Sequence, residues 1–221
     1  GTKTALVGES GSGKSTIIKL ILGLNSNYSG SIKYDNFNID TIPTREMSKI
    51  TTLITNDSYL VKGTIREHLS VRKNITEEEM YNALEKVNLK DFVEEHGGLD
   101  YELAIGAANL SGGQRQRLLA AKSILKDSYL YILDEAVSNI DDYSKEIVLN
   151  AFDSIKEGKI IIVISHDLET IANSDNIYVL KDKKIIEEGT HDELIEENSL
   201  YRKLFTDQQQ LKSKFLAKEV E

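Results

Sequence analysis

Short apolar runs alternate with longer stretches of mixed polarity along this chain. Three runs are apolar without strict alternation, at 5–7, 130–133 and 160–164. Runs of this kind favour strands that are buried on both faces, as in a parallel sheet covered by helices. Polar or glycine-rich residues and then a helical pattern follow each run, over 14–23, 141–156 and 167–173. The repeated strand–helix order predicts an α/β fold with a mainly parallel sheet core.

Two segments differ from this rhythm. The residues at 31–34 and 50–55 also have the pattern of strands. We expect a small antiparallel β part in addition to the mainly parallel core. Between about 57 and 126 the pattern is helical. We therefore predict a core formed by 1–56 and 127–221 and an inserted α-helical subdomain over 57–126.

Local signals mark further elements. Thr76 and Glu79 form a predicted capping box at the start of an amphipathic helix over 77–88. Thr190 and Glu193 predict a second box that opens another helix.

Two more elements are expected near the C-terminal end. Strands over 177–180 and 184–187, joined by Lys-Asp-Lys, resemble a hairpin. The tail from Asp207 has three Gln and mixed charges and predicts a helical or frayed terminus.

Composition narrows the possible functions. The 221 residues include no Cys, which excludes disulfides, thiolate metal sites and thiol nucleophiles. No run approaches the roughly 18–20 apolar residues of a membrane-spanning helix. The net charge of −9 argues against nucleic acid as a partner, because such binding depends on Lys and Arg. Most of the acidity lies in 76–102, with nine acidic residues against two Lys, as expected of a solvated helical face.

The segment 8–15, Gly-Glu-Ser-Gly-Ser-Gly-Lys-Ser, fits the phosphate-loop pattern G-x-x-x-x-G-K-[ST]. It lies between a predicted strand and a predicted helix, whereas a merely flexible glycine loop would need neither. Its glycines let backbone N–H groups surround an anion at a helix N-terminus. Lys14 adds a charge for the β- and γ-phosphates, and the Ser15 hydroxyl is suited to Mg²⁺. The segment predicts nucleotide binding.

Asp134 and Glu135 follow the predicted strand at 130–133. Ligands of open α/β sheets bind at the carboxyl ends of strands. Asp134 is placed for a Mg²⁺ shell, and Glu135 for orienting or deprotonating an attacking water. An acidic pair after a strand is more often a solvated strand end, but the phosphate loop favours the catalytic interpretation.

Ser111 and Gln114 form a third predicted capping box, with Gly112 and Gly113 between them. Glycines expose backbone N–H groups, so this helix start is a potential phosphate site. A purely structural helix cap is the alternative, and the residues alone favour it.

The motif order, however, closely resembles the nucleotide-binding domain of ATP-binding cassette transporters, over essentially the whole chain. Leu-Ser-Gly-Gly-Gln at 110–114 lies between the phosphate loop and the acidic strand end, and His166 follows the next strand. The exporter branch is indicated by Gln-Arg-Gln-Arg at 114–117, Ser-Asn-Ile-Asp at 138–141 and Thr-Ile-Arg-Glu-His-Leu at 64–69. The resemblance implies a P-loop NTPase fold.

The resemblance also implies the roles of the site residues. Glu135 would be the general base, His166 the switch residue at the γ-phosphate, and Asp141 a link between two sites. Mg²⁺ would be held by Ser15, Asp134 and Asn56. The residues expected to bind ATP are Gly8, Ser10, Gly11, Ser12, Gly13, Lys14, Ser15, Thr16, Ser111, Gly112, Gly113, Gln114 and Asp141.

The same resemblance implies partners. In this family two nucleotide-binding domains pack head to tail, so that the 111–114 segment of one copy covers the ATP of the other. A transmembrane domain of the transporter is the second expected partner, which places the chain at the cytoplasmic face of the cell membrane.

Three departures from the family pattern are visible. Asn56 stands where the family usually has a Gln that contacts Mg²⁺ and the attacking water, and it is one methylene shorter. In exporters an acidic, glycine-containing stretch usually precedes the signature, which here is the Leu-Ser-Gly-Gly-Gln segment at 110–114. In this chain the corresponding residues, 103–109, match that stretch only weakly. The aromatic residue that stacks on adenine is expected upstream of Gly1, in a longer polypeptide.

The main hypothesis is an ATPase motor domain of an exporter. A nucleotide-binding regulatory module with little hydrolysis is the alternative, and Asn56 makes it conceivable. A cassette ATPase of chromosome maintenance or DNA repair is disfavoured, because the 96 positions between Lys14 and Leu110 contain no sustained heptads. A guanine-specific GTPase is also disfavoured, because the sequence contains no Asn-Lys-x-Asp run. The remaining histidines lack metal-ligand spacing and are interpreted as structural: His68, His96 and His191.

Overall fold

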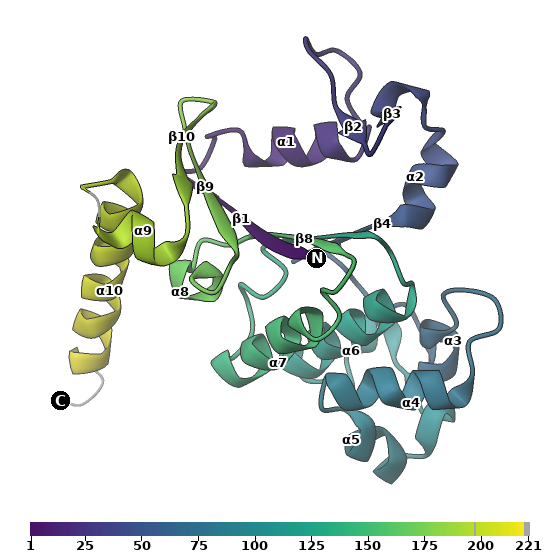
Figure 1. Ribbon diagram of the computed structural model, residues 1–221. Coiled ribbons are helices and arrows are strands. Elements are labelled where there is room, and N and C mark those ends of the chain that lie inside the picture. Colours follow the sequence, from purple (N-terminus) through teal and green to yellow (C-terminus); the bar gives the residue numbers. More distant parts are fainter. Residues whose placement is uncertain (197, 219–221) are drawn as a thin grey trace. The chain divides into compact units, whose positions relative to one another are not determined.

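The computed structural model describes residues 1–196 and 198–218. The chain forms two compact units (Figure 1). The first unit comprises Gly1 and Lys49–Ile161, and the second comprises Thr2–Ser48 and the chain from Ile162 onward. Helix α2 (Thr44–Ile50) contains one boundary between the units and strand β8 (Ile160–Ile164) contains the other.

The main sheet has the strand order β10-β9-β1-β8-β7-β4. Strand β1 pairs in parallel with β9, and β4 pairs in parallel with β7, whereas β10 is antiparallel to β9. The predicted α/β class with a mainly parallel sheet is therefore confirmed. The bounds of these strands are β1 (Thr2–Gly8), β4 (Thr51–Thr55), β7 (Leu130–Asp134), β9 (Asn176–Lys181) and β10 (Lys184–Gly189).

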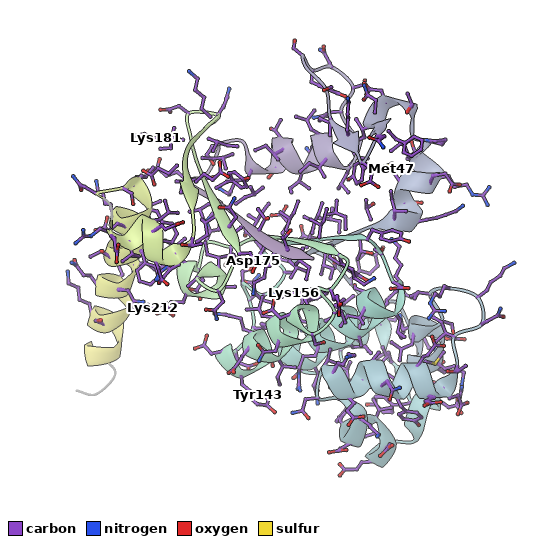
Figure 2. The ribbon with its side chains drawn as sticks, in the orientation of Figure 1. Met47, Tyr143, Lys156, Asp175, Lys181 and Lys212 are labelled. Carbon is purple, nitrogen blue, oxygen red and sulfur yellow. The ribbon has the colours of Figure 1, made fainter. Side chains whose placement is uncertain are left out.

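The second unit contains β1, β9 and β10 with the helix that follows the phosphate loop. Ala5, Val7 and Val179 of the paired strands are buried, as the apolar runs predict. Met47 of α2, labelled in Figure 2, is buried as well. The other elements are α1 (Lys14–Ile21), β2 (Lys33–Tyr34), β3 (Phe37–Asn38), a 3-10 turn η1 (Ile39–Thr41), α8 (Leu168–Ile171), α9 (His191–Glu196) and α10 (Leu200–Lys218).

The first unit contains β4 and β7 together with the helices drawn in teal in Figure 1. Helix α6 (Gly112–Leu125) contacts α7 (Asp142–Asp153), α4 (Glu77–Lys86) and α3 (Ile65–Leu69). The apolar core of the first unit includes Tyr131 and Phe152, whose ring centres lie 5.5 Å apart. The remaining elements are α5 (Lys90–Glu95), η2 (Gly98–Asp100), η3 (Ile105–Ala107) and the strands β5 (Gly63–Thr64) and β6 (Glu102–Leu103).

The strands β5 and β6 are the main element that the sequence pattern does not predict. They pair antiparallel, with Gly63 opposite Leu103 and Thr64 opposite Glu102. Two-residue strands are too short to show the period-2 alternation on which strand prediction depends. The segment over 57–126 is consequently helical with one short β ladder.

The predicted helix starts are confirmed. Thr76 and Glu79 form a reciprocal capping box at α4. Thr190 and Glu193 bond each other's backbone N–H groups at α9. Helix α4 ends at Lys86, earlier than the periodicity suggests, because Asn88 adopts a left-handed φ of 51°.

The C-terminal hairpin is also confirmed. Strands β9 and β10 are joined through Asp182 and Lys183, whose φ angles of 49° and 63° are those of a tight hairpin turn. The tail is helical through Lys218, as α10.

The three histidines interpreted as structural have protein partners. The Nε2 atom of His68 lies 2.9 Å from the Val61 carbonyl oxygen, and burial lowers the pKa of this buried side chain. His191 bonds the Tyr201 hydroxyl, and the ring of His96 stacks on Phe92. Within residues 1–196 and 198–218, no group of three or more His, Cys, Asp or Glu is placed to hold a metal ion. None of the described helices combines the length and apolar character that crossing a membrane requires.

Candidate functional site

The predicted phosphate loop connects β1 to α1 in the second unit, with a backbone that depends on glycine. Gly8, Gly11 and Gly13 have φ angles of 156°, 78° and 109°. A Cβ atom at Gly8 would lie 2.3 Å from the Leu180 carbonyl oxygen, so no side chain fits there. The loop is therefore held close to β9, and its turn needs residues that accept positive φ.

The Lys14 side chain folds back over this loop. Its Nζ atom donates to the carbonyl oxygens of Gly8, at 2.6 Å, and Glu9, at 3.0 Å. Gly13, at the N-cap of α1, supplies no side-chain cap for the N–H groups of the first turn. Ser15 and Thr16 are exposed in that turn. An ammonium group beside an uncapped helix N-terminus is suited to an anion such as a phosphate.

Two depressions border the loop. One is lined by Glu9, Ser10, Gly11 and Ser12 together with residues 180–183 and Leu200. The other is lined by Val7, Gly8 and Glu9, by Ser165 and His166 after β8, and by Leu168, Leu204 and Gln208. The exposed His166 side chain thus shares a depression with the start of the phosphate loop.

Asp134 and Asn56 meet at one edge of the sheet in the first unit. Asp134 is the last residue of β7 and is paired with Thr55, the last residue of the parallel strand β4. Asn56 follows Thr55 directly and is exposed. The register therefore brings the Asn56 amide to the strand end that carries the acidic pair.

Glu135 has an unusual backbone conformation. Its φ of 53° lies in the left-handed region, which non-glycine residues occupy at a cost. Its carbonyl oxygen accepts hydrogen bonds from the N–H and the hydroxyl of Ser138, at 3.1 and 2.9 Å. This tight turn fixes the direction in which the chain leaves β7. Strain of this kind clusters at functional sites.

The predicted capping box at 111–114 is confirmed at the start of α6. The Ser111 hydroxyl accepts from Gln114 N–H at 3.1 Å, and the Gln114 side chain accepts from Ser111 N–H at 2.8 Å. The two intervening glycines differ. A Cβ at Gly113 would lie 2.2 Å from Ser144 Oγ, whereas one at Gly112 would meet only Arg115, at 3.8 Å. Gly113 is therefore required by packing, and Gly112 leaves open backbone at the helix start.

Asp141 is the N-cap of α7. Its side chain accepts a hydrogen bond of 2.8 Å from Ser144 N–H, and this bond is the main cause that lowers the pKa of the carboxyl group. A Cβ at Gly113 would lie 2.7 Å from Asp141 Oδ2. Asp141 thus lies beside the signature segment in its own unit.

The residues predicted to hold Mg²⁺ carry donor groups of the kind that this ion prefers. Magnesium prefers oxygen ligands and is usually held by one or two carboxylates together with substrate phosphates. Ser15, Asp134 and Asn56 offer a hydroxyl, a carboxylate and an amide oxygen. The Ser12 hydroxyl oxygen is buried within the phosphate loop without a hydrogen-bond partner in the protein, as expected of a group that awaits a ligand.

The predicted site residues fall into three groups. Gly8, Ser10 to Thr16 and His166 belong to the second unit, where His166 and the loop share a depression. In the first unit, Asn56, Asp134 and Glu135 gather at adjacent strand ends, and Ser111 to Gln114 lie with Asp141 at the starts of α6 and α7. Sequence reasoning missed Gln208 and Ser144. The Asp141-x-x-Ser144 spacing at a helix start was a signal for the latter.

Comparisons with known proteins show the family of this chain. The family described as "ABC transporter" matches residues 1–138. An uncharacterized ABC transporter ATP-binding protein of Haemophilus influenzae is 43% identical over 209 residues, which are 94% of this chain and 37% of that protein. An ATP-dependent lipid A-core flippase of Neisseria meningitidis is 37% identical over 206 residues, 92% of this chain and 33% of that protein.

A solved structure is similar as well. A bacterial Atm1-family ABC exporter with ATP bound has a TM-score of 0.85 and 30% identity, over 94% of this chain and 37% of that chain. The chain thus spans about a third of the length of the relatives it matches. The fold, the motif order and these matches identify the chain as an ATP-binding domain of the ABC transporter family, of the exporter type.

Proposed function

We propose that this domain binds ATP with Mg²⁺, hydrolyses it, and so drives an ABC exporter that moves a substrate across a membrane. The phosphate loop would hold the β- and γ-phosphates through its N–H groups and Lys14. Mg²⁺, held by Ser15, Asp134 and Asn56, would neutralise charge on the phosphates. Glu135 would accept the proton of the attacking water, and His166 would contact the γ-phosphate.

The observation that carries this proposal is the register of β4 and β7. Because Thr55 pairs with Asp134, the Asn56 amide and the Glu135 carboxylate follow the ends of two neighbouring strands. An amide and a carboxylate at one strand edge are the groups that orient a water and take its proton. A protein that only bound nucleotide would not need a carboxylate that takes a proton from water.

The expected partners follow from the open segment at α6. Ser111, Gly112 and Gln114 lie at an accessible helix start, which supports their covering the γ-phosphate of a second copy packed head to tail. ATP binding would then close the dimer and hydrolysis would open it.

A transmembrane domain is the other proposed partner, at the cytoplasmic face of the membrane. A groove in the first unit is lined by 52–55, 57–59 and residues of α6. Leu53 and Tyr59, which belong to this lining, are exposed. Exposed apolar side chains next to Asn56 support a contact that would couple membrane segments to the ATP site.

The proposal is tested by comparing Glu135→Gln with wild-type protein, in the complete chain with Mg²⁺ and ATP. Loss of a general base lowers rates by about 100-fold to 10,000-fold. We expect phosphate release to fall by that much while ATP affinity changes little. Glu157→Gln is the matched control, because Glu157 is exposed and lies outside the site. Equal phosphate release by wild type and Glu135→Gln would refute hydrolysis at this site.

A regulatory module with little hydrolysis is the second candidate, favoured by Asn56. The Asn56 side chain is one methylene shorter than Gln and so extends less far toward Mg²⁺ and the attacking water. If wild-type turnover is close to that of Glu135→Gln and Asn56→Gln raises it, the regulatory function is supported. If Asn56→Gln leaves an already measurable rate unchanged, the motor function stands.

A further inference from the structure

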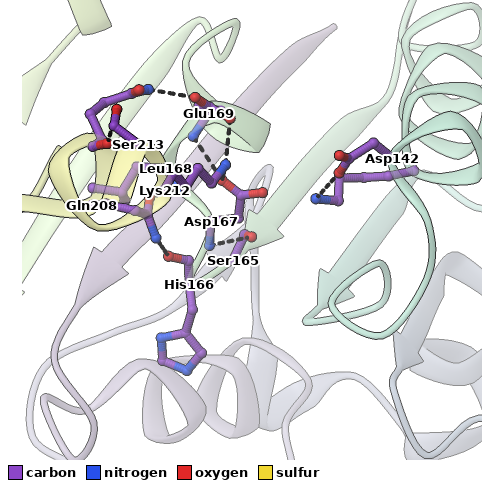
Figure 3. A network of polar contacts seen from close by, with 11 residues as sticks. Asp142, Ser165, His166, Asp167, Leu168, Glu169, Gln208, Lys212 and Ser213 are labelled. Atoms are coloured by element: carbon purple, nitrogen blue, oxygen red, sulfur yellow. Dashed lines mark hydrogen bonds and ion pairs between the residues drawn. The ribbon is translucent and has the colours of Figure 1, made fainter. Parts of the chain in front are cut away.

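Helix α10 bonds directly to the segment that carries His166. The Gln208 side-chain amide makes two hydrogen bonds to that backbone (Figure 3). Its Nε2 donates to the His166 carbonyl oxygen at 2.7 Å, and its Oε1 accepts from Leu168 N–H at 2.8 Å. One planar group therefore holds the peptide groups on both sides of Asp167.

Other hydrogen bonds lie within the segment itself. Asp167 N–H donates to the Ser165 hydroxyl at 3.0 Å, and the Asp167 side chain accepts from Glu169 N–H at 3.3 Å. Leu168 N–H, however, is bonded by a residue 40 positions away. Helix α8 has only four residues and cannot be stable alone. Its first turn depends on α10.

Lys212, one turn further along α10, adds charge to the same contact. Its Nζ lies 3.1 Å from Asp167 Oδ1 and 2.5 Å from Glu169 Oε2 (Figure 3). The bonds to Lys212 and Gln209 lower the pKa of Glu169. The Lys212 side chain is 40% exposed, so water screens these ion pairs and they contribute less than the amide contacts.

The His166 ring points away from the contact between its backbone and α10. Figure 3 shows the ring extending away from the Gln208 amide, while the backbone carbonyl of the same residue faces it. His166, Gln208 and Gly8 line that depression together. Gln208 thus holds the backbone of a residue whose side chain is directed elsewhere.

We infer that Gln208 is a positioning residue for ATP hydrolysis: it fixes the backbone of His166 so that the imidazole keeps its place at the phosphate loop. This inference rests on the proposed function, since it assigns His166 to the γ-phosphate. Small displacements of a contacting group from its reactive geometry lower rates without much effect on binding. The expected signature is therefore a lower kcat with little change in KM.

The test compares Gln208→Met, Gln208→Glu and Gln210→Met in the complete chain. Met keeps the length and packing of Gln208 but removes both hydrogen bonds. Glu keeps an acceptor for Leu168 N–H, but its second carboxylate oxygen replaces the donor and is repelled by the His166 carbonyl oxygen. Gln210 is exposed two residues further along the same helix and serves as the matched control.

We expect kcat per bound nucleotide to fall about 10-fold in Gln208→Met, as the loss of two hydrogen bonds to a positioned group suggests. The fall should be at least as large in Gln208→Glu, because its carboxylate is repelled by the His166 carbonyl oxygen. KM for ATP should stay within about 2-fold in both variants, because the phosphate-binding groups remain. Amide hydrogen exchange at Leu168 should become faster in Gln208→Met and stay unchanged in Gln210→Met. Normalising by bound nucleotide removes the effect of any unfolded fraction.

Two results would overturn the inference: a kcat in Gln208→Met equal to that of Gln210→Met, or unchanged exchange at Leu168. Failure of the proposed function has a different signature, namely wild-type turnover no higher than that of Glu135→Gln. If the proposed function fails, the positioning role of Gln208 can still be tested by amide exchange at Leu168 and by the His166 imidazole signals in the NMR spectrum. Faster exchange with displaced imidazole signals in Gln208→Met supports the positioning role, and unchanged signals overturn it.

Discussion

The phosphate loop at 8–13 and the helix start at 112–113 are both glycine-rich, but glycine has a different physical role in each. In the loop, Gly8, Gly11 and Gly13 adopt positive φ angles, so glycine serves the path of the backbone. At 112–113 both glycines lie in the first turn of α6, where other residues can adopt the same backbone angles. Gly113 is needed there because Ser144 and Asp141 leave no room for a Cβ.

A glycine in a sequence motif can therefore serve either backbone conformation or close packing. A glycine of the loop shapes a surface for an anion, whereas Gly113 joins α6 to α7. Of the glycines in these two segments, Gly112 alone has neither a positive φ angle nor a close neighbour that excludes a Cβ. Its position in the motif is therefore best explained by a partner or ligand that approaches the backbone closely, which agrees with the proposed contact to a second copy.

The largest effect is expected at the phosphate loop. In Gly8→Ala the new Cβ would lie 2.3 Å from a backbone oxygen of β9, which cannot yield like a side chain. We expect the free energy of unfolding to fall by about 3 kcal/mol. Denaturant unfolding monitored by circular dichroism measures this change.

Gly11→Ala is the matched control. Nothing lies within 4 Å of its Cβ, so only the φ of 78° opposes the substitution. A cost of about 1 kcal/mol is expected from that conformation. Equal costs at both positions would contradict the distinction between contact and conformation within the loop.

The next effect concerns the helix start. Gly113→Ala places a Cβ 2.2 Å from Ser144 Oγ and should destabilise the protein by about 2 kcal/mol, since a side chain can shift where a backbone cannot. Gly112→Ala should stay within about 0.5 kcal/mol, as at an open helical position. If Gly112→Ala keeps its stability but loses ATP-dependent dimerisation in gel filtration, the role assigned to Gly112 is supported. Equal destabilisation by both variants would refute the packing distinction.

A further effect, smaller than those at Gly8 and Gly113, is expected at Asp141, the cap of α7. Asp141→Ala should lower the melting temperature by less than Gly113→Ala does, because it removes a cap without creating a clash. Ser144 N–H lowers the pKa of Asp141 below its ordinary value of 3.8. The carboxylate therefore stabilises the fold above pH 3.8, and this contribution is lost as the pH falls through the folded-state pKa.

Melting curves of wild type and Asp141→Ala should consequently differ by a constant amount from pH 8 down to pH 5 and should converge only in stronger acid. Asp141→Asn serves as the control, since an Asn cap does not titrate and should retain most of the stability at every pH. A wild-type advantage that disappears between pH 5 and 8 would show that another group is responsible.

Local signals in the sequence predicted most of the fold. The apolar runs identified β1, β7 and β8, and three pairs of Ser or Thr with Glu or Gln identified the starts of α4, α6 and α9. Each of these signals lies within a few residues of the element it predicts. The pair β5–β6 has too few residues to carry such a signal.

The contacts that shape the candidate site could not be predicted in this way. The bond between Gln208 and His166 joins residues 42 positions apart, and no periodicity in α10 indicates it. Likewise, the sequence shows that Gly113 begins a helix but not that Ser144 lies against it. Resemblance to a family supplied the roles of Glu135 and His166, and only the paired strands show how Asn56 comes to lie beside the acidic pair.

One feature of the sheet limits how this domain can vary. A buried hydrogen bond of 2.7 Å joins the hydroxyls of Thr52 and Ser128, just before β7, and Thr55 remains paired with Asp134 at the other end. Each residue of a strand advances the chain by about 3.3 Å and reverses the side on which its side chain lies. A residue inserted or deleted between Thr52 and Asn56 would therefore turn the amide away from the acidic pair. A shorter amide at position 56 therefore cannot be compensated by a longer strand.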